Sequence, residues 1–168
     1  LWQQVVKKIS YFLQEFDSGN AAYYQSNTNQ YLKQLDSLHL QVSQQIMQIP
    51  EKQRVLITAH DAFEYFGRAY GIEVRGLQGL STVSEFGLKD ITDLVQFIID
   101  RNIQAVFIET SISERSIKAV VEGCRKRGHQ VRIGGSLYSD AMGDYGTPEG
   151  TYIGMVNANV ITITQALK

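Results

Sequence analysis

The chain has 168 residues, of which 43% are hydrophobic and 20% are charged, and this composition is typical of a folded globular domain rather than a disordered segment. A formal net charge of −1 argues against a nucleic-acid-binding protein. No apolar run approaches the roughly 20 residues that a membrane helix needs. The single cysteine, Cys124, excludes an internal disulfide and a thiolate cluster, so any metal site must use nitrogen and oxygen ligands.

Two helices are expected before Pro50. Apolar residues recur at helical spacing over 2–16, and the polar sequence at 17–20 ends that pattern. A second amphipathic helix is expected over 21–49, where Pro50 ends it. At about 28 residues this helix would be on the order of 40 Å long, which a compact small domain does not need. We therefore expect it to extend toward a part of the protein outside this chain, and the helical pattern at a start without Met suggests that the chain begins in mid-protein.

After Pro50, short apolar runs alternate with helical stretches. The expected strands are 55–57, 72–77, 105–108 and 131–133, and the expected helices are 61–70, 88–100, 113–127 and 150–167. Turns are expected at Gly71, Gly79 and Gly128, and helix starts are indicated by a capping-box spacing at 111–114 and by Thr147-Pro148. This alternation predicts an α/β fold, namely a Rossmann-like parallel sheet of four strands flanked by helices and preceded by the long helix.

Three polar residues follow expected strands: His60, Glu109 and Asp140. Because the carboxyl ends of parallel strands meet at one edge, where ligands collect, these side chains are expected near one another. An imidazole and a carboxylate suit a divalent cation. His60 as a metal ligand and His60 as a satisfied core or capping residue both remain open. Asp140 and Asp144 could equally form Asx turns, and for Asp144 we prefer that interpretation.

Glu109 ends an otherwise apolar strand, where an acid is costly unless it is paired. It could be a ligand or an acceptor that orients a neighbouring group, and its expected partner is Arg68, Arg115 or Arg132. Cys124 is expected to be a small buried residue. No nucleophile elbow surrounds Ser139, and no glycine spacing matches a phosphate-binding loop. The sequence therefore predicts no catalytic residue.

Three separated segments carry a family resemblance. They are Val55-Leu56-Ile57-Thr58-Ala59-His60-Asp61-Ala62-Phe63 with its continuation to Gly71, Phe107-Ile108-Glu109-Thr110-Ser111, and Leu137-Tyr138-Ser139-Asp140-Ala141-Met142-Gly143 followed by Gly150-Thr151-Tyr152. In this order, and over nearly the whole chain, they resemble the metal-binding solute-binding proteins of bacterial ABC transporters for manganese, zinc and iron.

The resemblance implies two α/β lobes joined by one long helix, with the metal between the lobes on four side chains, two from each lobe. It implies that residues 1–18 are a remnant helix of the N-terminal lobe, 19–50 the connecting helix and 51–168 the C-terminal metal-binding lobe. By motif match, His60 and Asp140 correspond to the two ligands of the C-terminal lobe, so this chain is expected to hold half a site. Glu109, Arg68 and Ser139 are candidates for contacting and orienting those ligands. A ligand of the N-terminal lobe is expected just before residue 1.

The resemblance further implies an exported protein, periplasmic or on the cell surface, that captures a transition-metal ion and delivers it to a membrane permease. We expect manganese or iron as the ion; zinc is compatible with the same ligands. Binding by the half-site alone should be weak, and it should weaken further in acid, because coordination needs a neutral imidazole and an ionised carboxylate. Two alternatives remain: a metal-dependent hydrolase built on His60, Glu109 and Asp140, and a metal-free adhesin or interaction fragment.

Overall fold

In the computed structural model, which describes residues 1–78 and 88–168, the chain forms two compact units, residues 1–41 and 42–168. The first unit contains α1 (Trp2–Phe16), the 3₁₀ turn η1 (Ser18–Asn20) and most of α2 (Ala21–Met47), which continues into the second unit. No helix of the described ranges is long and apolar enough to span a membrane.

The turn between α1 and α2 is closed by the Asp17 carboxylate. Its Oδ2 accepts hydrogen bonds from Asn20 Nδ2 and from the Tyr24 hydroxyl, both at 2.9 Å. These donors stabilise the charged form and lower the pKa of Asp17 below its ordinary value. Farther along the pair of helices, the Thr28 hydroxyl donates to Ser10 Oγ at 2.7 Å. Polar contacts thus hold this helical hairpin together.

The apolar side of α1 is exposed. Six large apolar side chains of this helix are between 40% and 92% exposed: Trp2, Val5, Ile9, Phe12, Leu13 and Phe16. The helical periodicity that predicted α1 is therefore real, but its apolar face is not buried by the described part of the chain.

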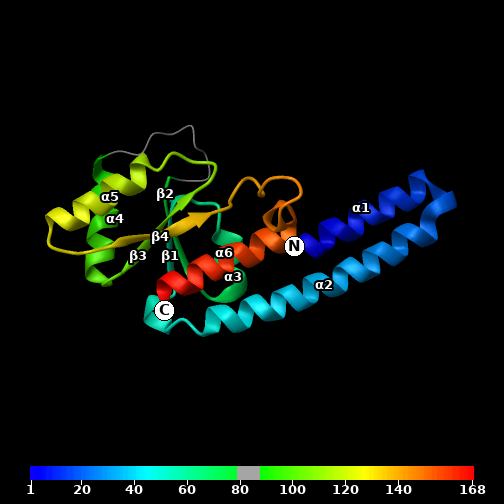
Figure 1. The fold of residues 1–168 in the computed structure, drawn as a ribbon, viewed down its shortest axis with the longest axis horizontal. Helices are drawn as coiled ribbons and strands as arrows, with labels where there is room; N and C mark the ends of the chain where they lie inside the picture. The colour runs from blue at the N-terminus through cyan, green and yellow to red at the C-terminus, as the bar shows by residue number, and fades with distance from the viewer. Residues whose placement is uncertain (79–87) are drawn as a thin grey trace. The chain divides into compact units, whose positions relative to one another are not determined.

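The second unit is an α/β domain with parallel strands (Figure 1). Its elements after α2 are, in chain order, η2 (Glu51–Gln53), β1 (Val55–His60), α3 (Glu64–Tyr70), β2 (Glu73–Gln78), α4 (Leu88–Asp100), β3 (Ala105–Glu109), α5 (Arg115–Lys126), β4 (Arg132–Leu137), η3 (Pro148–Gly150) and α6 (Tyr152–Leu167). The predicted α/β class, the parallel strands and the long preceding helix are confirmed.

The strands pair two by two. β1 pairs with β2 and β3 pairs with β4, each in parallel, and β1 lies next to β3. The predicted four strands are thus present, but among the described residues their backbone ladders form two two-stranded sheets instead of one continuous sheet. A side chain joins β1 to β3: the His60 N–H donates to Glu109 Oε1 at 3.0 Å, where a backbone carbonyl would stand in a continuous ladder.

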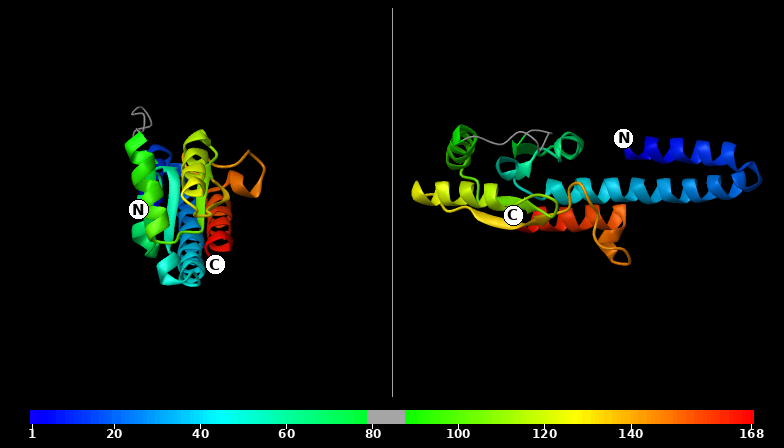
Figure 2. Two further views of the ribbon diagram at one scale, coloured as in Figure 1. Left: turned by 90° about the vertical axis from the view of Figure 1, so that its left-hand side faces the viewer. Right: turned by 90° about the horizontal axis from the view of Figure 1, so that it is seen from above.

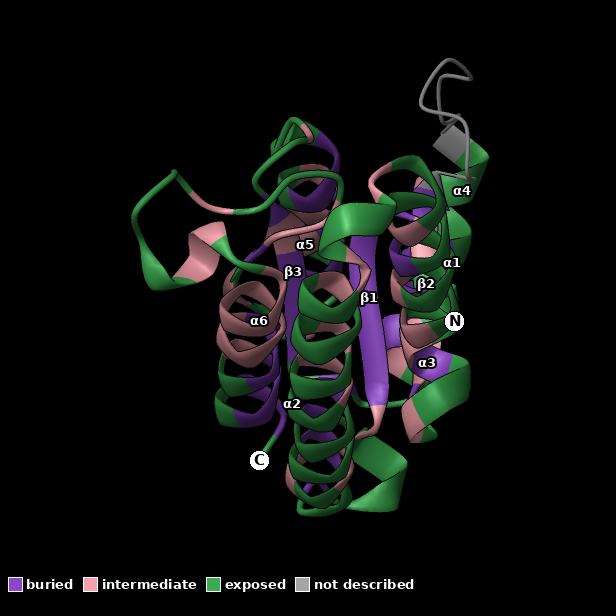
Figure 3. Ribbon diagram, turned by 90° about the vertical axis from the view of Figure 1, so that its right-hand side faces the viewer, coloured by how far each residue is buried: buried purple, intermediate pink, exposed green. Residues whose placement is uncertain are grey.

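Helices cover both faces of the strands, as Figure 2 shows for α4 and α6 on opposite sides. On one face, side chains of β1 and β3 pack with α4 and α5 in a single cluster that includes Ile57, Val106, Ile98 and Ile117. β1 is buried along its whole length, which Figure 3 shows in purple. A strand buried on both sides reads as a continuous apolar run, and for this reason Val55-Leu56-Ile57 was recognisable in the sequence.

β4 extends beyond the predicted 131–133 and includes Gly134 and Gly135, where α6 packs closely against it. A Cβ atom on Gly134 would lie 2.7 Å from Ala166 Cβ, and one on Gly135 would lie 2.5 Å from Thr162 Cγ2. The two glycines thus let α6 approach β4 closely, and the strand continues through a pair of residues that sequence statistics disfavour in strands.

Several predicted helix starts and turns differ in detail. The capping box at 111–114 is wrong: the N-cap of α5 is Glu114, which makes no side-chain cap bond. Thr147 does act as an N-cap, but of η3, and Thr151 caps α6 by accepting from the Gly154 N–H. Gly71 and Gly128 have the positive φ angles expected at turns, whereas Gly79 lies outside the described residues.

Candidate metal site

His60 is the last residue of β1 and is held through its main chain. Its N–H donates to Glu109, and its carbonyl accepts from the Thr58 hydroxyl at 2.8 Å and from the Ala62 N–H at 3.1 Å. The side chain is only 5% exposed. The hydrogen bond from the Ala62 N–H to the His60 carbonyl bends the chain directly after β1. The helix α3 (Glu64–Tyr70) therefore begins at Glu64 and not at the predicted position 61.

The imidazole of His60 faces Glu109 with one nitrogen. Nδ1 lies 2.6 Å from Glu109 Oε2, and the glutamate side chain is fully buried. Neither atom has another hydrogen-bond partner within the described ranges. An ionised carboxylate can only accept, so its proximity favours the tautomer with a proton on Nδ1 and leaves the Nε2 lone pair free. The partner of Glu109 is therefore His60 and none of the three arginines expected from the sequence.

The other imidazole nitrogen faces Asp140. Nε2 lies 3.3 Å from Asp140 Oδ2, and the Asp140 side chain is 60% exposed. The predicted convergence of these two residues at one edge of the strands is thus found. With Nδ1 protonated, Nε2 and Oδ2 are both acceptors, and two acceptors at this distance attract each other only when a cation, a proton or a metal ion, stands between them.

The distance itself fits a shared metal ion. Nitrogen and oxygen ligands about 2.1 Å from one ion lie roughly 3.0 to 3.4 Å from each other in octahedral or tetrahedral geometry. The observed 3.3 Å falls in that range. A buried nitrogen and an exposed carboxylate then form one side of a site that opens to solvent.

The loop that carries Asp140 is fixed by Asn159, a residue that the sequence reading missed. Asn159 lies on α6 and is 5% exposed. Its Oδ1 accepts from the Tyr138 N–H at 2.9 Å, and its Nδ2 donates to the Tyr138 carbonyl at 2.7 Å. The side chain thereby supplies both bonds that a neighbouring strand would give to the backbone just beyond β4. One sequence pattern could have identified Asn159: it is an amide at a core-facing helix position, four residues before the buried Ile163.

A second contact ties this loop to the loop after β3. Ser111 Oγ and Ser139 Oγ lie 2.8 Å apart, and either hydroxyl can be the donor. Ser139 thus supports the Asp140 loop through Ser111, which explains why Ser111 does not cap α5. No contact of the Ser139 hydroxyl with His60 or Glu109 is found among the described residues.

Gly76 allows the end of β1 to lie where it does. A Cβ atom at this position of β2 would stand 2.6 Å from the Asp61 nitrogen and 2.8 Å from the His60 carbonyl carbon. Both are backbone atoms that cannot move aside without moving His60. No pattern in the sequence singled out Gly76 for this role.

The remaining candidates lie outside this cluster. Arg68 pairs with Glu64 at 3.7 Å and stacks over the Tyr65 ring, and both its partners belong to α3. The main chain of Asp144 closes a turn by accepting from Thr147. Cys124 is buried as predicted, and burial raises the pKa of its thiol. Within 1–78 and 88–168, no group of three or more His, Cys, Asp or Glu side chains is arranged to hold a metal ion.

Comparison with known proteins places this chain in a class. Over 168 residues the chain is 51% identical to the manganese-binding lipoprotein MntA of Bacillus subtilis, covering 100% of this chain and 55% of that protein. It is 47% identical over 167 residues to the zinc-binding protein TroA of Treponema pallidum, covering 99% of this chain and 54% of TroA. A third relative, the metal ABC transporter substrate-binding lipoprotein SloC of Streptococcus mutans, is 27% identical over 161 residues, with 96% of this chain and 50% of SloC covered.

The solved structure of periplasmic zinc-binding TroA matches the fold with a TM-score of 0.96 and 46% identity, over 99% of this chain and 60% of that one. The fold and the sequence relatives together define part of a metal-binding substrate-binding protein. The family model described as ZnuA, zinc-uptake complex component A periplasmic, matches residues 1–166, and the chain belongs to this family. It is a family of uptake proteins and not of enzymes. The chain spans about half the length of the relatives above.

Proposed function

We propose that this chain supplies half of a binding site for a transported transition-metal ion, with His60 Nε2 and an Asp140 carboxylate oxygen as the two ligands. The observation that carries the proposal is their 3.3 Å separation, with the other imidazole nitrogen committed to a buried glutamate. Glu109 acts from behind the imidazole: it fixes the tautomer and the ring orientation and makes Nε2 a better donor. Arg68 has no part in this arrangement.

The ion we propose is manganese, iron or zinc. Imidazole and carboxylate ligands serve all three, and intrinsic affinity favours zinc over manganese and ferrous iron. MntA is named for manganese and TroA for zinc, which supports the class of ion. Selection among them depends on the number and geometry of the remaining ligands.

We propose that the remaining ligands come from an N-terminal lobe. In this division residues 1–18 belong to that lobe, 19–50 connect the lobes, and 51–168 form the lobe that holds His60 and Asp140. The exposed apolar face of α1 supports it, because six large apolar side chains on one helix are expected to be covered in the working protein.

The function that follows is capture without chemistry. The protein would take up the ion outside the cytoplasm, in the periplasm or on the cell surface, and hand it to the permease of an ABC importer. The names of MntA and SloC as lipoproteins and of SloC as an ABC transporter component support this location and this partner. Neither the hydrolase nor the adhesin alternative is favoured by any contact of the site.

Metal affinity of a protein carrying both lobes tests the proposal. Calorimetric titration with Mn²⁺ and Zn²⁺ should show strong binding that His60→Ala or Asp140→Ala each weaken by at least about a hundredfold, as expected for loss of a direct ligand. His39→Ala, which removes an exposed imidazole on α2, is the matched control and should leave affinity unchanged. The 168-residue chain alone should bind far more weakly. Equal affinities for the His60 and His39 variants would remove His60 from the site.

A further inference from the structure

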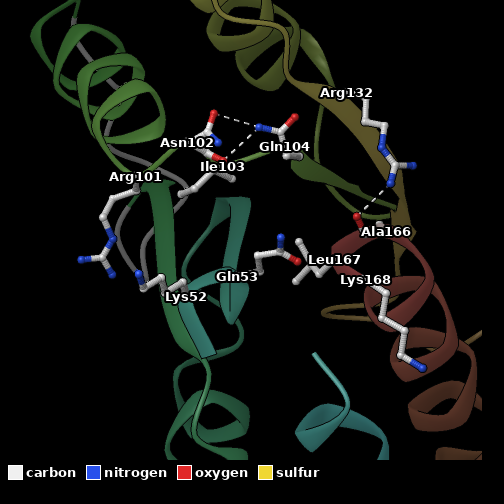
Figure 4. Close-up of a pocket in the computed structure, with 10 residues that line it drawn as sticks. All are labelled: Lys52, Gln53, Arg101, Asn102, Ile103, Gln104, Arg132, Ala166, Leu167 and Lys168. Carbon is white, nitrogen blue, oxygen red and sulfur yellow. Dashed lines mark hydrogen bonds between the residues drawn. The ribbon is translucent and has the colours of Figure 1, made fainter. Parts of the chain in front are cut away.

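A second concave site lies at the opposite end of the same strands. It is a cavity of about 280 Å³, near the small end of the range for ligand pockets. Its lining comes from η2, from the turn before β3, from the first residue of β4, from the end of α6 and from Lys168 just after it (Figure 4). Strands of five or six residues separate this edge from the His60 edge by roughly 15 Å. The metal site therefore does not account for it.

The charged side chains that line this cavity are all basic. Lys52, Arg101, Arg132 and Lys168 contribute to it, and no Asp or Glu is found among its lining residues within the described ranges. Figure 4 shows Lys52 and Arg101 on one side of Ile103 and Leu167, and Arg132 and Lys168 on the other. The cavity thus has an apolar middle with positive charge on two sides.

Three of these basic groups are partly engaged in ways that orient them. Arg132 Nη2 donates to the Ala166 carbonyl at 2.9 Å, which fixes the guanidinium at the end of α6 and leaves its other N–H donors available. Arg101 Nη2 pairs with Glu73 at 2.7 Å and lies over the Phe97 ring. The Lys168 ammonium donates to the Gln48 side chain.

Lys52 and Gln53 are not engaged in this way. Neither side chain has a hydrogen-bond or ion-pair partner among the residues described, and both are exposed on η2. Gln104 donates from Nε2 to the carbonyl and to the Oδ1 of Asn102, both at 3.0 Å. The Asn102 amide Nδ2 is thereby held in place beside the cavity as a further donor.

From this arrangement we propose that the cavity binds a small organic dianion, an aliphatic dicarboxylate. One carboxylate lies between Lys52 and Arg101, the other meets the free N–H donors of Arg132, and the methylene chain lies on Ile103 and Leu167. Positive groups on both sides of an apolar floor favour two anionic ends over one, and cations inside a concave surface attract anions more strongly than the same cations on a flat one.

Two-dimensional ¹H–¹⁵N NMR of the chain, titrated with glutarate, tests this proposal. We expect saturable shifts confined to amides around 52–53, 101–104, 132 and 166–168. Butyrate, which has one anionic end, should bind about fivefold more weakly, as expected for loss of one charge-assisted contact at an exposed site, and 1,5-pentanediol should cause no saturable shift. Inorganic phosphate tests whether the cavity binds any small anion, and we expect it to bind more weakly than glutarate.

Variants separate a site from general charge attraction. Lys52→Ala removes a side chain without a partner, so the fold should be retained while glutarate binding weakens about fivefold. Gln53→Glu is nearly isosteric and places a carboxylate in the cavity, and it should abolish binding. Lys126→Ala removes an exposed cation of α5 and serves as the control, with unchanged binding. Non-saturable shifts, phosphate or butyrate binding as strong as glutarate binding, or equal effects of the Lys52 and Lys126 variants would overturn the proposal.

Discussion

Glu109 contacts His60 at two points although 49 residues separate them in the sequence: Oε1 accepts the main-chain N–H at 3.0 Å, and Oε2 lies 2.6 Å from Nδ1. One carboxylate therefore sets both the end of β1 and the orientation of the imidazole. A buried acid is costly when alone, and these two contacts offset that cost. The same residue joins β1 to β3 and leaves Nε2 of the imidazole facing Asp140.

Replacing Glu109 by Gln should damage both roles. An amide has one acceptor oxygen, so either the His60 N–H or Nδ1–H is left without a partner, and we expect a loss of about 1 to 3 kcal/mol in the free energy of unfolding. Metal affinity of the two-lobe protein should fall about 10- to 100-fold. Urea unfolding and calorimetry measure the two effects. Glu64→Gln on the exposed face of α3 is the control. If Glu109→Gln changes stability and metal affinity no more than this control does, Glu109 has neither role.

Asn159→Ala should release the loop that carries Asp140. Both main-chain groups of Tyr138 would lose their partner, at a cost of about 1 to 3 kcal/mol in stability, and metal affinity should drop about tenfold because Asp140 is no longer held near Nε2. Asn157→Ala, also on α6, is the control, because the Asn157 side chain makes no hydrogen bond to this loop within the described ranges. If the NMR signal of the Asp140 amide and the metal affinity are the same in the two variants, Asn159 does not position Asp140.

Gly76→Ala should displace His60 without altering any ligand. The added methyl carbon would stand 2.6 Å from the Asp61 nitrogen, so the backbone after β1 has to shift. We expect a destabilisation of about 1 to 3 kcal/mol, typical of overpacking, together with weaker metal binding. Gly19→Ala, where the nearest atom is 3.8 Å away, is the matched control. Unchanged affinity in a folded Gly76 variant would show that β2 does not set the position of His60.

The Asp17 turn should respond to pH. Hydrogen bonds from Asn20 and Tyr24 lower the pKa of Asp17 in the folded protein, so its contribution to stability is present above the pKa of the unfolded chain and is lost as pH falls through the lower, folded value. Tyr24→Phe removes one donor and should raise the Asp17 pKa toward the ordinary value. Carboxyl ¹³C NMR titration follows this directly, with Tyr23→Phe as the control. A pKa that is equally low in both variants would mean that the Tyr24 hydroxyl has no effect on Asp17.

The strands and the approach of His60 to Asp140 were predictable because each rests on a local pattern. A fully buried strand such as β1 is a continuous apolar run, and parallel topology brings the residues that follow such runs to one edge. The acid at Glu109 was recognisable as needing a partner. Its actual partner was not, because the choice between His60 and three arginines depends on which strands are adjacent.

The supporting contacts depend on tertiary packing, which a single sequence does not encode in any short pattern. Asn159 meets Tyr138 only because α6 returns alongside β4, and Gly76 matters only because β2 pairs with β1 in the observed register. The Ser111 hydroxyl could have bonded either to the start of α5 or to the loop after β4. In the structure it contacts Ser139 in that loop. Capping spacing alone could not reveal that competition.

The central claim, that His60 and Asp140 bind one ion together, is tested most directly by anomalous diffraction from crystals of the two-lobe protein loaded with Mn²⁺. The account predicts one strong anomalous peak about 2.0 to 2.3 Å from both His60 Nε2 and an Asp140 carboxylate oxygen, with Glu109 still against Nδ1. A peak bound elsewhere, or one that contacts only one of the two residues, would contradict it.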